Sequence, residues 1–158
     1  MATDRLYCAA FSDVTNNVAF LSLTNPVEAD EDPTSGDGVA GYRCATDEQT
    51  GNAQFVLTNL SDTPTTLTSI TLRVRARFVS WSDDTTEHTF TANVGSNTAS
   101  VTFTGAADGG DPGAWTLKTA TVSITGVTEA NLNAAWILWE QTNWSRNKGA
   151  DGSSLEVD

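Results

Sequence analysis

The side chains that could carry out chemistry in this chain of 158 residues are few. His88 is the single histidine, and catalytic or metal-binding histidines usually act with further His or Cys partners. Because His88 is in phase with Phe90 and Ala92, we predict a buried or half-buried strand histidine instead. The sequence contains no nucleophile elbow, phosphate-cradling glycine loop or CxxC pair. We therefore predict no catalytic residue, no cofactor and no metal site, and a protein that is not an enzyme.

Carboxylates are the one abundant reactive group, with 20 Asp and Glu against 8 Lys and Arg. Glu87 and Glu140 lie within predicted strands, and folding could bring such acids together as a hydrolytic pair, so the sequence leaves this alternative open. Asp30 and Asp32 match two positions of a calcium-binding EF-hand loop, but the glycine and the bidentate Glu that such a loop requires are missing. We expect residues 25–38 to form a solvated acidic loop.

The five tryptophans suggest a binding function of another class. Exposed aromatic rings on a β-sandwich can stack on sugar rings, with acids and amides nearby. Trp81, Trp115 and Trp144 lie at strand ends or in loops, where they could form such a sugar-binding platform. Trp136 and Trp139 lie within the apolar segment AWILWEQ, and we assign them to the core or to an interface between subunits.

A row of arginines lies on the strand predicted for residues 66–81, whose apolar residues alternate strictly with polar ones. This period of two is typical of a strand with one buried and one solvated face. Arg73, Arg75 and Arg77 share the solvated face, so substituting them should leave the core intact. Two interpretations stay open: the row is a solvated face balanced by local carboxylates, or it docks on an acidic surface such as the Glu28–Asp37 loop of a second copy.

The remaining pattern predicts the fold class. Roughly eight to ten short strands alternate with turns, and one segment, 127–134, can form a short helix capped by Thr128. We predict an all-β protein, an antiparallel two-sheet β-sandwich of the jelly-roll type with at most one short helical turn. The chain forms a single domain, 1–158, with N-terminal strands in 1–24, the acidic loop in 25–38 and the main sandwich in 39–158.

Composition also bounds the partners and the location. A net charge of −12 argues against binding to nucleic acid or to an anionic membrane, which needs a basic surface. No apolar run approaches the roughly 20 residues that span a bilayer, and the N-terminus does not resemble a signal peptide. We expect synthesis in a cytoplasm, and therefore predict that Cys8 and Cys44 are reduced thiols.

Residues 25–158 resemble a family of small jelly-roll virion proteins of tailed bacteriophages and related viruses. The resemblance rests on the order of an acidic loop, an arginine-rich strand, two hairpin strands, a threonine-rich strand, a short helical element and a terminal strand, at Asp30–Pro33, Ile70–Arg77, Glu87–Phe103, Trp115–Thr125, Thr128–Asn133 and Ser153–Asp158. It implies a non-enzymatic role in the virion, as a capsid decoration (cement) protein that contacts the major capsid protein. The alternative is a tail or baseplate component, or a carbohydrate-binding jelly-roll module for host attachment. In a decoration protein, the capsid shell is a second acidic surface on which the arginine row could dock.

Residues 135–141 predict how copies of the chain associate. This segment is apolar on both faces of a strand, so it is either a central strand covered on each face or a strand that lies under a neighbouring subunit. We predict a homo-oligomer, a trimer, with Trp136 and Trp139 at the interface.

Overall fold

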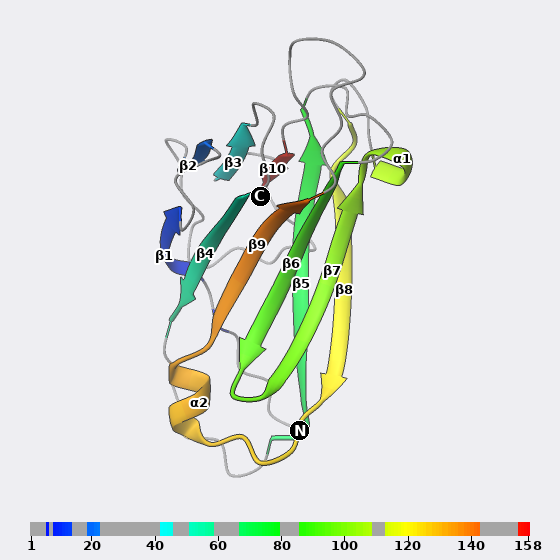
Figure 1. Cartoon of the computed structure of the whole chain (residues 1–158). Helices are drawn as coiled ribbons and strands as arrows, with labels where there is room; N and C mark the ends of the chain where they lie inside the picture. Colours follow the sequence, from blue (N-terminus) through cyan, green and yellow to red (C-terminus); the bar gives the residue numbers. More distant parts are fainter. Residues whose placement is uncertain are drawn as a thin grey trace.

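The computed structural model describes residues 6, 8–13, 19–22, 42–45, 51–58, 67–79, 86–108, 113–142 and 155–158. Within these ranges the chain forms ten β-strands and two short α-helices (Figure 1). The strands build two five-stranded sheets, and every strand pair is antiparallel. The predicted all-β sandwich is confirmed.

We name each sheet after one of its strands, β9 or β5. The β9 sheet has the order β1 (Cys8–Asp13), β4 (Gly51–Leu57), β9 (Trp136–Thr142), β6 (Glu87–Val94) and β7 (Asn97–Thr104). The β5 sheet has the order β2 (Ala19–Ser22), β3 (Tyr42–Ala45), β10 (Leu155–Val157), β5 (Ser69–Phe78) and β8 (Thr116–Ser123). Among these strands, only β2–β3 and β6–β7 follow one another within a sheet; the other connections cross between the sheets, as in a jelly roll.

Alternation of apolar and polar residues explains which side chains form the core. Along β5 the buried residues are Leu72, Val74, Ala76 and Phe78, while the residues between them face outward. Along β6 the same period buries His88, Phe90, Ala92 and Val94. Val94 belongs to a second, smaller cluster with Leu132 and Ala135. The other apolar residues of these faces pack against β4, β7, β9 and β10 in one cluster that contains Phe55, Val101, Phe103, Trp139 and Leu155. Burial of this apolar surface is the main term that stabilises the sandwich.

The sequence predicted one of the two helices. Helix α2 (Glu129–Asn133) begins after Thr128, whose hydroxyl accepts a hydrogen bond from the Asn131 backbone N–H at 3.3 Å, as expected for an N-cap. Helix α1 (Gly105–Asp108) lies outside the single helical segment, 127–134, that the sequence predicted. The reason is local: the Thr104 hydroxyl accepts from the Ala107 N–H, and the Asp108 carboxylate accepts from the Thr104 N–H, which closes one turn.

Strand β9 is the middle strand of its sheet, between β4 and β6. Residues 135–141 therefore contain a central strand, while the covering of its outer face, by this chain or by a neighbouring subunit, stays a prediction. A two-residue hairpin turn joins β6 to β7, and in it Gly95 has a φ of 61°, a conformation that glycine adopts without strain.

Several predictions fall on residues outside the described ranges. These are the acidic loop at 25–38 with Asp30 and Asp32, and the tryptophans Trp81 and Trp144. Cys8 lies in β1 and Cys44 in β3, so they belong to different sheets. Their side chains are not described, and the reduced state of both thiols stays a prediction.

Candidate binding surfaces

Two of the three arginines on β5 form ion pairs with the end of the chain. Arg77 donates from Nε and Nη2 to the same carboxylate oxygen, Oε2 of Glu156, at 3.1 and 2.9 Å. Arg75 donates from Nη1 to Oδ2 of Asp158. Both carboxylates are almost fully buried, with side-chain exposures of 4% for Glu156 and 2% for Asp158. Arg75 and Arg77 thus correspond to the first interpretation of the arginine row, in which carboxylates of the same chain balance their charge.

Trp115 lies beneath the same two guanidinium groups. The Cζ atoms of Arg77 and Arg75 are 4.5 and 5.3 Å from the centre of a Trp115 ring, within the range of cation–π contacts. One side of this ring is thus occupied within the chain, which leaves less of it for the sugar platform that the sequence suggested. Arg73 differs from its neighbours, because it is exposed and has no ion-pair partner in the described part of the chain.

The outer face of the β9 sheet carries an apolar strip that no described helix or strand covers (Figure 1). Trp136 and Leu138 point outward from β9 and are half-buried. Val56 on β4 lies directly opposite Trp136 and is 45% exposed, the most exposed large hydrophobic side chain of the described residues. We call Val56, Trp136 and Leu138 the outer apolar strip. The sequence had singled out Trp136 for an interface, and this position is consistent with that assignment.

Polar side chains surround the outer apolar strip on the same face. The hydroxyls of Thr89 and Thr102 hydrogen-bond across β6 and β7 at 2.9 Å, and those of Thr91 and Ser100 do so at the same distance. Glu140 follows Leu138 on the outer side of β9 and lies opposite Thr89 of β6. Glu87 is on the same face, one outward position farther along β6, so the two glutamates are diagonal neighbours.

Trp139, the other tryptophan assigned to the core or an interface, belongs to the core. It is fully buried, and its ring stacks on Phe90 and Phe55 with centroid distances of 5.0 and 6.1 Å. Its indole Nε1–H donates to Nδ1 of His88 at 3.2 Å. A side chain in this position cannot contact another subunit while the sandwich is folded.

His88 is the buried strand histidine that the sequence predicted. It is fully buried, and burial lowers the pKa of its imidazole from the ordinary 6.5 to about 3. The ring is therefore neutral at pH 7, and since Nδ1 accepts from Trp139, the proton is on Nε2. Within the described ranges, no group of three or more His, Cys, Asp or Glu side chains is arranged to hold a metal ion.

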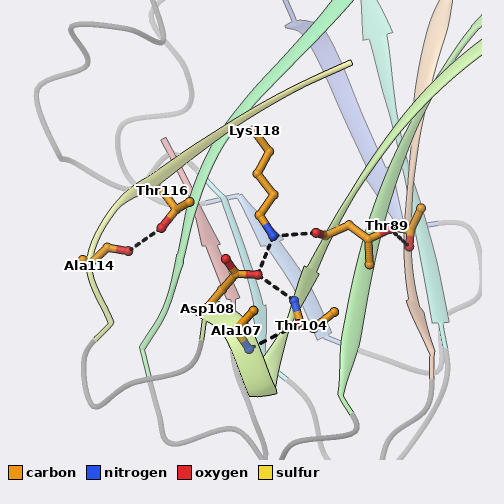
Figure 2. A network of polar contacts seen from close by, with 8 residues as sticks. Thr89, Thr104, Ala107, Asp108, Ala114, Thr116 and Lys118 are labelled. Carbon is orange, nitrogen blue, oxygen red and sulfur yellow. Dashed lines mark hydrogen bonds and ion pairs between the residues drawn. The ribbon is translucent and has the colours of Figure 1, made fainter. Parts of the chain in front are cut away.

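A polar network that sequence reasoning missed joins β8 to the end of β7 (Figure 2). Lys118 of β8 donates from Nζ to Oδ2 of Asp108 at 2.6 Å and to the backbone oxygen of Thr102 at 2.7 Å. The same Asp108 oxygen accepts from the Thr104 N–H at 2.8 Å. In the sequence, only the rarity of lysine draws attention to Lys118. The contact with Asp108 could not be predicted, because the edges of two different sheets come together only when the chain folds. We call Lys118 and Asp108 the β7 edge clamp.

Comparisons with known proteins identify no family for this chain. No known protein-family profile matches it, and no curated protein does. Among solved structures, it is similar to a carbohydrate-binding module, TmCBM61, in complex with β-1,4-galactotriose, with a TM-score of 0.39 and 13% identity. The match covers 94% of this chain and 83% of that one. A similarity at this level carries no argument about function. No helix of the described residues is long and apolar enough to span a membrane.

Proposed function

We propose that this chain is a non-enzymatic structural protein of a virus particle, a capsid decoration protein, and that it contacts its neighbours through the outer face of the β9 sheet. The proposal combines the resemblance of residues 25–158 to small virion proteins with one structural observation. That observation is the outer apolar strip, where an exposed valine lies beside a tryptophan on a sheet face that no described element covers.

The chemistry of this face suits a protein–protein contact. Tryptophan contributes more than most residues to the affinity of such interfaces when it is desolvated at their centre. Removal of apolar surface from water contributes roughly 25 cal/mol per Å². The hydroxyl pairs of β6 and β7 supply a neutral polar border beside the strip. Under this function, the predicted trimer would assemble on the particle, where the chain would also contact the major capsid protein.

Carbohydrate binding is the second candidate function, because of a particular arrangement on the same face. Trp136 offers an aromatic ring, and the hydroxyls of β6 and β7 together with Glu140 offer hydrogen-bond partners in the same plane. These are the groups with which β-sandwich proteins bind sugars. As a binding module on a particle, the chain would then serve attachment to a host surface.

The two candidate functions predict different observations: a decoration protein is a component of the virus particle, and a sugar-binding module binds glycans. Virus particles from the source organism, banded on a density gradient, are expected to contain this chain in a fixed ratio to the major capsid protein by mass spectrometry. Its absence from the banded particles would contradict the structural role. A glycan array probed with the wild-type chain and with Trp136→Ser tests the second candidate, which requires a signal that the substitution abolishes.

A further inference from the structure

The four outer edges of the two sheets are protected to different degrees. The edge strands are β1 and β7 in the β9 sheet and β2 and β8 in the β5 sheet. An unprotected edge presents a row of backbone N–H and C=O groups that can pair with another chain, and proteins blunt such edges with bulges, short strands or lysines. Strand β1 has a register shift between Cys8 and Ala10, and β2 is four residues long.

Strand β7 is protected by the β7 edge clamp (Figure 2). In the two-residue β6–β7 hairpin, Val94 pairs with Asn97, so the odd-numbered residues of β7 bond to β6 and the even-numbered ones point their backbone groups outward. Lys118 donates a hydrogen bond to the outward C=O of Thr102, and Asp108 accepts one from the outward N–H of Thr104. A new strand could not bond to β7 at these positions.

Strand β8 has none of these protections among the described residues. The Ile124 N–H donates to the Thr68 C=O at 3.1 Å, which continues the β5–β8 register and shows that the even-numbered residues bond to β5. The backbone groups of the odd-numbered residues therefore point to the free edge; these residues are Leu117, Thr119, Thr121 and Ser123. Strand β8 is eight residues long and contains no proline, and its single charge, Lys118, is held by the clamp.

We propose that β8 is the edge through which two copies of this chain pair, antiparallel and about a two-fold axis, so that two β5 sheets become one continuous sheet. One register bonds all four outward residues of each strand: Leu117 pairs with the partner's Ser123, and Thr119 pairs with the partner's Thr121. The two-fold axis then passes beside Ala120.

A second copy fits this edge better than a charged partner does. The outward residues are neutral, and β8 contains no carboxylate, so the pairing avoids the repulsion that a net charge of −12 causes elsewhere between two copies. Threonine hydroxyls already bond across strands in this fold, as in the 2.9 Å contact between Thr71 and Thr121. Ala120 is half-buried on the inner side of β8, and in this register it would be covered by the partner's Ala120, while Val122 would lie opposite the partner's Lys118.

This contact lies on the opposite sheet from the face proposed for the particle, so either proposal can fail without the other. Sedimentation equilibrium of the purified chain is expected to show a dimer, and Thr121→Pro is expected to weaken it about tenfold or more, because an outward N–H is lost from each copy. Ser100→Pro is the matched control, since it removes an outward N–H from the clamped edge β7 and should leave the dimer unchanged. Melting curves of both variants establish that they are folded.

A cross-link tests the register, and keeps the proposal open to refutation should the proline variants fail to fold. In a background of Cys8→Ser and Cys44→Ser, Ala120→Cys is expected to form a disulfide-linked dimer on mild oxidation, because residue 120 faces its own copy at roughly 4.5 Å between Cα atoms. Val122→Cys faces the partner's strand about 13 Å from its own copy and should not cross-link. A strictly monomeric wild-type chain, or equal cross-linking at both positions, overturns the proposal, as does equal weakening by the two prolines.

Discussion

Arg77 of β5 and Glu156 of β10 lie directly opposite each other, and two hydrogen bonds from the guanidinium reach a single oxygen of the carboxylate. The pair joins the longest of the described strands to the last of them. The Glu156 side chain is only 4% exposed, and the guanidinium of Arg77 supplies a positive charge that compensates its negative charge. The arginine row is thus partly a structural element, and the expectation that all three arginines could be changed without effect on the fold needs revision.

This relationship predicts different consequences for two arginines on one face. Arg77→Met keeps an apolar stem but removes two hydrogen bonds and a positive charge from a buried carboxylate, and we expect a loss of about 2–4 kcal/mol in the free energy of unfolding. Arg73→Met is the matched control, because Arg73 is exposed and unpaired within the described ranges, and its substitution should change stability by less than about 0.5 kcal/mol. Urea denaturation of both variants measures the difference, and equal effects would refute the assignment.

The buried imidazole of His88 predicts how stability responds to acid. Its pKa is about 3 in the folded chain and near 6.5 when unfolded, so below pH 6.5 the unfolded chain binds a proton that the folded chain does not. The contribution of neutral His88 is therefore complete above pH 6.5 and declines as the pH falls toward 3. We expect the protonation of His88 in the unfolded chain to lower the free energy of unfolding by about 2 kcal/mol between pH 7 and pH 5.

Comparison with His88→Gln separates this effect from the titration of the many carboxylates. Glutamine retains an oxygen that can accept from Trp139 Nε1–H, and it does not titrate. The variant should lose less stability than the wild type between pH 7 and pH 5, as measured by urea denaturation at each pH. The same slope in both proteins would mean that His88 is not the group responsible.

The β7 edge clamp predicts an energetic coupling between Lys118 and Asp108. Their side chains are 27% and 9% exposed, and the Asp108 carboxylate accepts hydrogen bonds from both Lys118 and the Thr104 N–H. We expect a double-mutant cycle of Lys118→Met and Asp108→Asn to give a coupling free energy of about 0.5–2 kcal/mol. A coupling of zero would show that the two groups contribute independently, and that the β7 edge is not closed by their pairing.

The sequence was most informative where contacts follow from local periodicity. Alternation along residues 70–78 was enough to predict which side of β5 is buried, because successive side chains of a strand point to opposite faces. Thr128 was recognisable as an N-cap because the hydroxyl acts on a backbone group three residues away. The burial of His88 followed from its phase with Phe90.

The sequence was least informative where distant strands meet. Arg75 and Asp158 are 83 residues apart along the chain, and nothing in either segment indicates the other. The position of Trp115 beneath two arginines depends on the pairing of β5 with β8 and could not be read from its own neighbours. The same is true of Val56, which is conspicuous only because β4 places it opposite Trp136 on an uncovered face.

The central claim is that the outer apolar strip attaches this chain to a virus particle. The most direct measurement supplies tagged wild-type chain, Trp136→Ser or Arg73→Ser during infection and determines the ratio of tagged chain to major capsid protein in gradient-purified particles. We predict that Trp136→Ser is folded but depleted from particles at least about tenfold, as expected for a central interface tryptophan, whereas Arg73→Ser is incorporated like the wild type. Full incorporation of Trp136→Ser, or depletion of Arg73→Ser alone, would contradict the account.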